Sequence, residues 1–539
     1  MNTKQKIFLS IIFSIAAILC PAQEYVSKVW SPDLGNGKYK NPVIYADYSD
    51  PDVCQAGDDY YMTASSFGCV PGLPVLHSKD LVNWTIVSYA LQELEPTVFF
   101  DKPQHGNGVY APCIRYHNGE FYIYWGDPDF GIYVVKTKDP AGEWEKPVLV
   151  KSGKGLIDPS PLFDDDGKAY LVHAWAGSRS RINSVLTVSE MNPEGTKVVG
   201  KEIIVFDGLA DRNHTVEGAK FYKRNGYYYI FAPAGGVKRG WQLALRSRHI
   251  LGPYEQRVVL EQGTSPINGP HQGAWVDTKT GESWFLHFQD QEAYGRVIHL
   301  QPIEWINDWP EMGKEKNGKR EPVLTYKKPD VGTVYPKINP IESDEFDKPE
   351  LGLQWQWHAN PKDPWAMPTN LGFLRLYAIP YPENYSNLWD VPNLLLQKFP
   401  AEEFMATTKL IFSAIGKEEK TGLLIMGLDY SYLSINHTID GYTLSQVVCR
   451  NAEKKTEETI IASEPVQTNV VWLRVKVSKN AVCEFSYSTD GKKYVSIGKP
   501  FNARAGRWIG AKVGLFALNP NERGNLGYAD FDWFRIEKE

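Results

Sequence analysis

The sequence predicts an all-β protein of two domains, a five-bladed β-propeller followed by a β-sandwich. An aromatic-rich phrase recurs five times within the first 300 residues, helical periodicity is almost absent there, and alternating apolar and polar runs fill the last 200 residues. The 539 residues are enough for two hydrophobic cores, because single cores stop growing at roughly 250 to 300 residues.

The N-terminal segment 1–22 is predicted to be a secretory signal and not part of the fold. Two lysines precede a thirteen-residue apolar run (7–19), and the small residues Cys20-Pro21-Ala22 stand before Gln23. The run is too short to span a bilayer, which takes about 20 apolar residues. We therefore expect an exported, periplasmic protein with no membrane span. An extracellular protein, or one lipid-anchored at Cys20, is the alternative, although the bulky Leu19 disfavours the anchor.

The propeller is predicted over residues 23–309 from the repeated phrase, in which a turn residue precedes an aromatic-rich strand. The last residues of the five phrases are Tyr61, Tyr122, Tyr170, Tyr229 and Trp284, at intervals of 61, 48, 59 and 55. Units of about 50 residues that consist of short strands and Gly, Pro, Asn or Asp turns are typical of propeller blades. Five phrases predict five blades.

The repeat also predicts which side chains meet. Counting back eleven or twelve residues from each aligning aromatic leads to Asp50, Tyr110, Asp158, Glu217 and Gln272, with His271 beside the last. Equivalent positions of successive blades lie on a ring around the propeller axis. Three carboxylates, a tyrosine and a histidine are therefore expected at one mouth of the channel.

Each of these residues has a simpler interpretation when taken singly. Asp50 and Asp158 precede proline, where Asp usually stabilises a turn, while Glu217 could be a solvated strand end and His271 a loop histidine. Apolar neighbours and the shared phase favour a functional cluster. Such a cluster suits glycoside hydrolysis, in which a protonated acid donates to the leaving oxygen and an ionised carboxylate activates water or attacks carbon.

Seven stretches along the propeller, in order, carry a resemblance to a known family. They are residues 41–44, 48–53, 64–67, 77–84, 157–161, 216–219 and 295–302. Together they resemble glycoside hydrolase family 43. The resemblance implies an inverting reaction with Asp50 as general base, Glu217 as general acid, and Asp158 as the residue that orients the acid and raises its pKa.

The same resemblance implies further contacts around the sugar. Arg296 would hold a sugar hydroxyl or the central carboxylates, and Phe67 would wall the pocket of the terminal sugar. His271 would lie at the channel centre, where relatives hold a calcium ion through waters. Tyr110 stands where many relatives carry Trp, so the substrate contact from this blade stays open.

The segments after the propeller are predicted to be a surface linker (310–340) and a β-sandwich (341–539). Both ends of the sandwich resemble the concanavalin-like jelly roll that follows the propeller in β-xylosidases and arabinofuranosidases, where one loop closes the sugar pocket and favours exo cutting. The alternative is a sandwich that only supports the propeller, with Trp355 and Trp357 in its core. A structural calcium near Asp344 and Asp532 is conceivable, and the chemistry itself requires no cofactor.

The main functional prediction is an exo-acting α-L-arabinofuranosidase that acts on arabinoxylan, arabinan or arabinosylated xyloglucan. The alternatives are an exo-β-1,4-D-xylosidase, a non-catalytic carbohydrate-binding propeller and, least favoured, a retaining fructosidase. The expected partner is an oligosaccharide or polysaccharide; the net charge of −6 supplies no basic field for nucleic acid. Five cysteines beyond Cys20 show no metal or redox spacing, so a disulfide is possible but not needed. The oligomeric state stays open.

Overall fold

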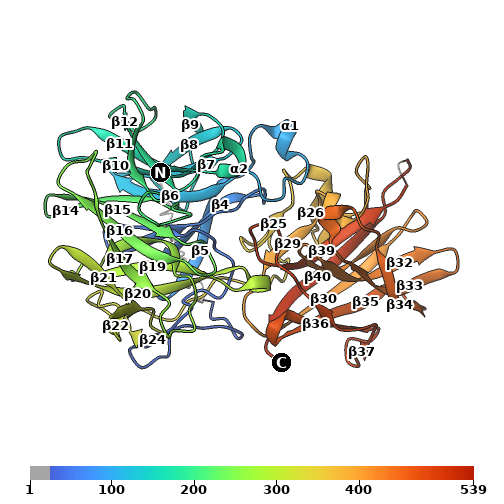
Figure 1. Cartoon of the computed structure of the whole chain (residues 1–539). Helices are drawn as coiled ribbons and strands as arrows, with labels where there is room; N and C mark the ends of the chain where they lie inside the picture. The colour runs from blue at the N-terminus through green and yellow to red at the C-terminus, as the bar shows by residue number, and fades with distance from the viewer. Residues whose placement is uncertain (1–24, 522) are drawn as a thin grey trace, which may run out of the picture.

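The computed structural model describes residues 25–521 and 523–539, so the predicted signal segment 1–22 lies outside the described residues. Two β-domains lie side by side, the propeller on the left and the sandwich on the right of Figure 1. Within the described part of the chain, no helix is long and apolar enough to cross a membrane. The helices that are present are short: α1 (Thr97–Phe100), α2 (Gly177–Ser180), and the 3-10 turns η1 (Glu292–Tyr294), η2 (Asp363–Trp365), η3 (Leu388–Asp390), η4 (Ala452–Lys454) and η5 (Lys479–Ala481).

The propeller has five blades, each a four-stranded antiparallel sheet, as predicted. The first two blades comprise β2 (Asp52–Ala56), β3 (Asp59–Thr63), β4 (Gly72–Ser78) and β5 (Trp84–Leu91), then β6 (Tyr110–His117), β7 (Glu120–Asp127), β8 (Gly131–Thr137) and β9 (Val148–Ser152). The third and fourth comprise β10 (Leu156–Phe163), β11 (Ala169–Trp175), β12 (Val185–Met191) and β13 (Ile203–Asp207), then β14 (Lys220–Arg224), β15 (Tyr227–Ala234), β16 (Trp241–Ser247) and β17 (Glu255–Glu261). The fifth comprises β18 (His271–Asp277), β19 (Ser283–Asp290), β20 (Arg296–Ile306) and β21 (Trp309–Met312).

The repeated aromatic phrase forms the second strand of every blade. Its rings pack between blades: Tyr61 of β3, for example, meets Phe121 of β7 edge to face at 4.9 Å between ring centroids. Buried apolar residues form one cluster at each of the five blade–blade contacts. The aromatic phrase therefore recurs in the sequence because each blade packs against its neighbours through the same strand.

The propeller closes because the chain returns its N-terminal segment to the last blade. The backbone N–H of Val43 donates to the carbonyl of Ile298 at 2.7 Å, and that of Ile298 donates to Ile44 at 3.0 Å. Slightly further along, the N–H of Tyr48 donates to the carbonyl of Arg296 at 3.1 Å. This pairing brings the start of blade 1 next to the strand that carries Arg296.

The structure differs from the linker predicted at 310–340. Strand β21 is the fourth strand of blade 5, and β22 (Lys314–Lys316) and β23 (Lys319–Glu321) form a hairpin. Strand β24 (Thr325–Lys327) then pairs with β1 (Lys38–Lys40) near the N-terminus. The charged composition that suggested a linker belongs to short, exposed strands, because exposed edges are commonly protected by charged side chains.

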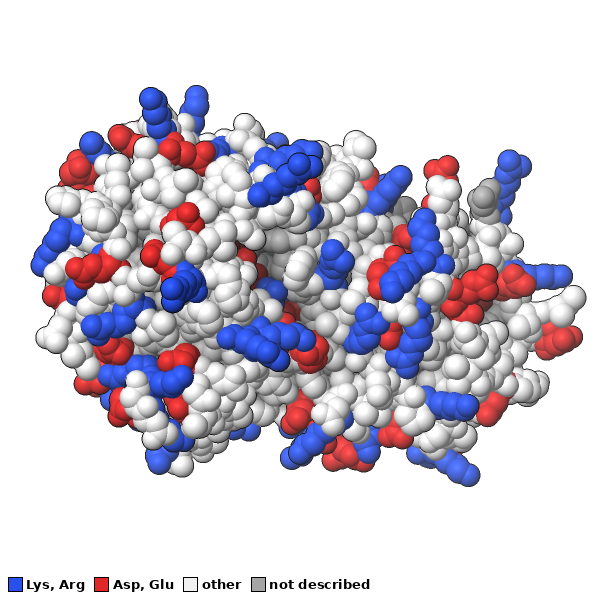
Figure 2. All heavy atoms as spheres, in the orientation of Figure 1, with Lys and Arg blue, Asp and Glu red and all other residues white. Residues whose placement is uncertain are grey.

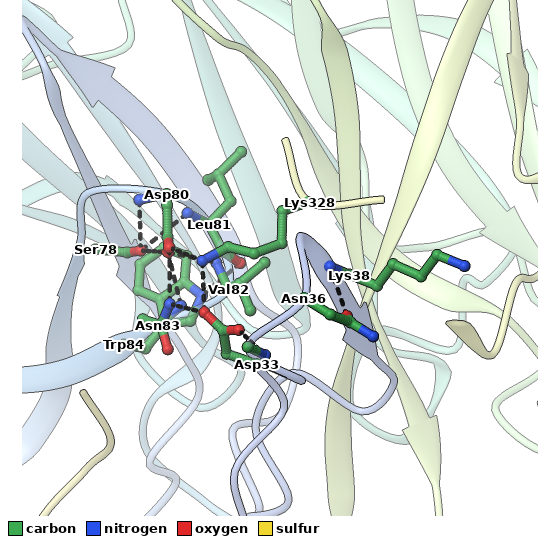
Figure 3. A network of polar contacts seen from close by, with 11 residues as sticks. Asp33, Asn36, Lys38, Ser78, Asp80, Leu81, Val82, Asn83, Trp84 and Lys328 are labelled. Atoms are coloured by element: carbon green, nitrogen blue, oxygen red, sulfur yellow. Dashed lines mark hydrogen bonds and ion pairs between the residues drawn. The ribbon is translucent and has the colours of Figure 1, made fainter. Parts of the chain in front are cut away.

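The stretch 77–84 proves to be part of a second closure element, which we call the closure latch: Asp33, Asp80, Asn83 and Lys328. Figure 3 shows the Lys328 ammonium between the two carboxylates, 2.5 Å from Asp33 and 2.8 Å from Asp80. The amide of Asn83 donates to both carboxylates, at 3.0 and 2.7 Å. The latch ties blade 1 to the segments that precede and follow the propeller.

The sandwich consists of two eight-stranded sheets packed face to face, as predicted. One contains β25 (Gln356–Trp357), β29 (Leu395–Lys398), β39 (Lys512–Asn519), β31 (Lys420–Met426), β32 (Tyr430–Thr438), β33 (Gly441–Cys449) and β34 (Thr459–Val466), with β28 (Ile379–Pro380) beside β39. The other contains β26 (Ala366–Pro368), β27 (Leu374–Tyr377), β40 (Tyr528–Glu537), β30 (Phe404–Ser413), β35 (Val470–Ser478), β36 (Val482–Ser488) and β37 (Val495–Ser496), with β38 (Phe501–Asn502) beside β36.

The two domains share buried surface. Trp355 and Trp357 lie in the sandwich core, and Tyr45 and Tyr294 of the propeller belong to the same apolar cluster. On the face drawn in Figure 2, acidic and basic side chains are interspersed over both domains, so this face carries no broad field of one sign. The five cysteines within the described residues are buried and form no disulfide.

Candidate active site

A backbone feature that recurs in every blade directs the side chains at the start of the blade toward the channel mouth. The residue at or next to each predicted position has a positive φ: Asp50 (56°), Ala111 (33°), Asp158 (55°), Gly218 (62°) and Gln272 (47°). The strand pairing is irregular at the same place in β6, β10 and β18. Bulges of this kind redirect side chains, and non-glycine residues adopt positive φ only where the surroundings enforce it. The phase found in the sequence is thus a repeated kink of the chain.

One cavity of about 420 Å³ collects most of the predicted site residues. The members that line it are Asp50, Phe67, Tyr110, Asp158, Glu217 and Arg296. His271 lies directly behind the cavity wall, where its Nε2 is 3.7 Å from Glu217 Oε1. Residues from all five blades therefore meet at one mouth of the propeller.

Asp50 is a buried carboxylate with three donors. Its Oδ1 accepts a hydrogen bond from Arg296 Nη1 at 3.0 Å. Its Oδ2 accepts from the hydroxyls of Ser49 at 2.8 Å and Ser65 at 2.6 Å. An ion pair supported by two further hydrogen bonds stabilises a negative charge at this position.

Asp158 has fewer compensating partners. Its side chain is buried, and its Oδ2 accepts the backbone N–H of Gly218 at 2.6 Å. Burial and the charge of Asp50 raise the pKa of Asp158 to about 7, against the opposing effects of the Gly218 N–H and the Lys220 ammonium. The bond to Gly218 also connects blade 3 to the residue that follows Glu217.

Glu217 faces the cavity, with 30% of its side chain exposed there. Removal from bulk water is the largest cause that raises the pKa of Glu217, and the charges of Asp158 and Asp50 follow; together they bring it to about 8. Arg296 opposes this shift. The repulsion from Asp158 expected from the sequence is present, but burial contributes more.

His271 is fully buried, and neither ring nitrogen has a hydrogen-bond partner among the described residues. Burial lowers the pKa of His271 to about 3, and the nearby Arg296 and His287 add to the effect. The imidazole is therefore neutral at physiological pH. Two unpartnered ring nitrogens fit a contact made through water, which is the role that the predicted calcium would require of this residue.

The two carboxylates considered for a structural calcium already have partners within the sandwich. Asp344 accepts hydrogen bonds from the backbone N–H of Phe346 and from the indole of Trp355, and Asp532 pairs with Lys409 at 2.6 Å. Across the described residues, no group of three or more His, Cys, Asp or Glu side chains could hold a metal ion. Asp344 and Asp532 are better explained as structural contacts of the sheet.

The aromatic pair Phe67 and Tyr110 forms one wall of the cavity. Phe67 is buried, with a positive φ of 49°, and packs edge to face against Tyr110 at 5.0 Å between centroids. The phenol of Tyr110 donates to the carbonyl of Gly106. Because this bond engages the hydroxyl group with the backbone, Tyr110 presents its ring, and not a free hydroxyl, to the cavity.

Sequence reasoning missed the outer wall. Trp508 comes from the loop 504–511 of the sandwich, has a positive φ of 66°, is 49% exposed, and lines the cavity close to Gly106 of the propeller. Arg179, in α2, lines it too, held by Asn107 at 2.6 Å and by Asp129. Neither lies at the repeat phase, so no periodic signal in the sequence marks them.

The cavity therefore holds two carboxyl groups in different surroundings. The pKa of Glu217 is raised to about 8, which favours its protonated form at neutral pH, while Asp50 pairs with Arg296 at 3.0 Å. One group that can donate a proton and one that can accept it, across a single cavity, is the arrangement that glycoside hydrolysis uses.

Comparison with known proteins agrees with this geometry. Residues 39–310 match the family described as glycosyl hydrolases family 43, and residues 343–537 match the β-xylosidase C-terminal concanavalin A-like domain. The chain is 37% identical to a putative β-xylosidase of Xylanibacter ruminicola (91% of this chain, 88% of the relative). It is 29% identical to the non-reducing end alpha-L-arabinofuranosidase BoGH43B of Bacteroides ovatus (93% and 95%). The crystal structure of the GH43 BlXynB protein from Bacillus licheniformis superimposes with a TM-score of 0.80 at 27% identity (93% and 100%).

Proposed function

The chain belongs to glycosyl hydrolases family 43, and we propose that it is an exo-acting, inverting hydrolase that removes a terminal pentosyl group from a plant polysaccharide. The observation that carries this proposal is the pair of carboxyl groups at the cavity, Asp50 paired with Arg296 and Glu217 with a raised pKa. A binding propeller without catalysis would not need two carboxyl groups in such different surroundings.

In the proposed reaction, Glu217 gives its proton to the glycosidic oxygen as the bond to C1 breaks. A water molecule loses a proton to Asp50 and attacks C1 from the opposite face, which inverts the anomeric centre. Asp158 holds the Gly218 N–H and adds the nearby negative charge that helps Glu217 to retain its proton.

The cavity supports exo cutting because aromatic side chains of both domains wall it. Phe67 and Tyr110 come from the propeller, and Trp508 comes from the sandwich. A volume of about 420 Å³ fits a terminal sugar and part of its neighbour better than the middle of a long chain.

Two pentosyl groups are candidates. The name of the Xylanibacter ruminicola relative favours a β-D-xylosyl group, and we place it first because that relative shares the higher identity. The name of the Bacteroides ovatus relative favours an α-L-arabinofuranosyl group, for which arabinoxylan, arabinan and arabinosylated xyloglucan are the candidate polymers.

The test compares nitrophenyl β-D-xylopyranoside with nitrophenyl α-L-arabinofuranoside, and follows the first-formed anomer by proton NMR. We expect turnover of at least one substrate with inversion, and its loss in Asp50→Asn. Turnover of neither substrate, or of unrelated hexosides only, would overturn the pentosidase proposal. Release of the substrate's own anomer would overturn the roles of Asp50 and water.

Two further expectations join the proposal. Export to the periplasm rests on the signal pattern of residues 1–22, and is tested by fractionating cells that express the full chain. A water-mediated calcium beside His271 rests on its two unpartnered ring nitrogens. Calcium-dependent protection of the folded chain against heat, lost in His271→Phe, would support that site.

A further inference from the structure

A buried carboxylate outside the catalytic group connects the two domains at the cavity. Asp47 lies three residues before Asp50 in the segment that closes the propeller, and its side chain is only 4% exposed. Its Oδ1 accepts the backbone N–H of Arg296 at 2.8 Å, and its Oδ2 accepts the backbone N–H of Gly510 at 2.9 Å. One carboxylate thus binds a strand of blade 5 and a loop of the sandwich.

The first contact fixes the start of β20. Arg296 is the first residue of this strand, and its guanidinium binds Asp50 and Ser49. The preceding Gly295 has a positive φ of 74°, and a Cβ there would lie 2.5 Å from the Asp47 side chain. The backbone approaches Asp47 so closely that only glycine fits.

The second contact fixes the loop that carries Trp508. A Cβ at Gly510 would lie 2.8 Å from the nitrogen of Gly295, so the loop and the start of β20 are in direct backbone contact. The next residue, Ala511, donates its N–H to the carbonyl of Ala293 at 2.7 Å. Trp508 stands two residues before this anchored point and reaches the cavity from there.

We propose that Asp47 is a positioning residue for the reaction, which fixes the sandwich loop bearing Trp508 relative to the Arg296–Asp50 ion pair. The same carboxylate positions Arg296, which stabilises the charge of the base, and the loop of Trp508, which forms a wall of the sugar pocket. A buried carboxylate that accepts two backbone N–H groups from different domains is a rigid connection, because either donor left unpaired would be costly. The kinetic part of this proposal rests on the proposed function, but its structural part does not.

The structural part is tested by hydrogen exchange of the full chain. In Asp47→Ala we expect faster exchange in the peptides that contain Arg296 and Gly510, both at once, because both N–H groups lose their acceptor. The matched control is Asn360→Ala, which removes another buried connection between the domains, to the backbone of Leu94. Unchanged exchange in either peptide, or equal changes in Asn360→Ala, would overturn the connection whether or not the protein hydrolyses a pentoside.

The kinetic part is tested by a double-mutant cycle on whichever nitrophenyl pentoside the wild type hydrolyses. We expect Asp47→Asn to lower kcat/KM about tenfold, through both a lower kcat and a higher KM, because small displacements at a site cost this much or more. In the Trp508→Ala background the KM effect of Asp47→Asn should vanish while the kcat effect remains. Additive KM effects, or a change below twofold, would show that Asp47 only joins the domains.

A second variant covers the case in which Asp47→Asn fails to fold. Gly510→Ala leaves Asp47 intact but pushes the loop from Gly295. We expect it to raise KM severalfold with a smaller change in kcat, since the loop moves while Arg296 retains its acceptor. Wild-type KM in a folded Gly510→Ala protein would contradict the proposal.

Discussion

The channel mouth and the closure latch both bury carboxylates beside a cation, yet their acids behave in opposite ways. In the latch, burial acts to raise the pKa of Asp33, but hydrogen bonds from Lys328, Asn83 and the Gly35 N–H bring it below its ordinary value. At the mouth, burial and neighbouring carboxylates raise the pKa of Glu217 to about 8, with Arg296 as the opposing charge.

The difference teaches that burial alone does not decide the chemistry of a carboxylate in this fold. The latch supplies a donor for nearly every carboxylate oxygen, so its charges are stabilised and its role is structural. At the mouth, no donor from the described residues forms a hydrogen bond with the Glu217 carboxyl group, whereas Arg296 donates to Asp50. Burial without compensating donors is costly for stability, and in the proposed reaction it keeps a proton available for transfer.

The largest expected effect is at the mouth. Glu217→Gln should lower the rate on natural oligosaccharides by about a thousandfold, because general acid catalysis contributes typically 10²- to 10⁴-fold. A substrate with a good leaving group needs little protonation and should retain measurable turnover. Comparison of kcat for both substrates is the measurement, and equal losses on the two would contradict the acid role of Glu217.

The corresponding change in the latch should affect stability and not catalysis. Lys328→Met leaves Asp33 and Asp80 buried without their cation and should cost about 3 kcal/mol or more of unfolding free energy. The control is Lys319→Met, which removes a surface pair with Glu261 and should cost far less, because exposed ion pairs contribute little. Denaturant unfolding and kcat/KM measured together decide the matter. A stable Lys328→Met protein with impaired kinetics would reverse the assignment of the two regions.

A smaller effect is expected from Asp158→Asn. A neighbouring negative charge raises the pKa of Glu217, so neutralising Asp158 lets Glu217 lose its proton at lower pH. The basic limb of kcat/KM, which we expect near pH 8 in the wild type, should move downward, but should remain above the ordinary glutamate range because burial persists.

The acidic limb of the same profile reports the base and should move less. A lower plateau is also expected, because Asp158 holds the N–H of Gly218 next to the acid. The measurement is kcat/KM across pH for both proteins, with folding checked by circular dichroism. A basic limb that stays in place or moves upward would make Asp158 a positioning group without influence on the proton of Glu217.

The smallest effect concerns stability at the mouth. The pKa of Glu217 is near 4.5 in the unfolded chain and is raised to about 8 in the folded protein. Ionisation of this group therefore lowers the stability of the fold as the pH rises from about 4.5 to about 8. Glu217→Gln cannot ionise, so its melting temperature should exceed that of the wild type by a few degrees at pH 8 and by less at pH 5. A difference that is constant with pH would mean that Glu217 carries no ionisation cost.

The sequence alone determined the fold class and which acidic side chains lie together at the channel mouth. Blade packing repeats the same aromatic strand, and a repeated kink precedes that strand, so Asp50, Asp158 and Glu217 could be found from one phase. The sandwich followed from its alternating strands. Both predictions succeed because they depend on periodic, local patterns of burial.

Tertiary structure decided what periodicity does not encode. The charged composition of residues 310–340 predicts a linker, but this charge belongs to short exposed strands. One of them, β24, pairs with β1, which lies almost 300 residues earlier in the sequence. Trp508 lines the cavity and Asp47 holds the loop of Trp508, both from outside the repeat phase and through contacts that span the two domains. The pKa of Glu217 likewise depends on burial and on neighbours from other blades. Such properties arise when distant segments come into contact, so no local pattern in the chain records them.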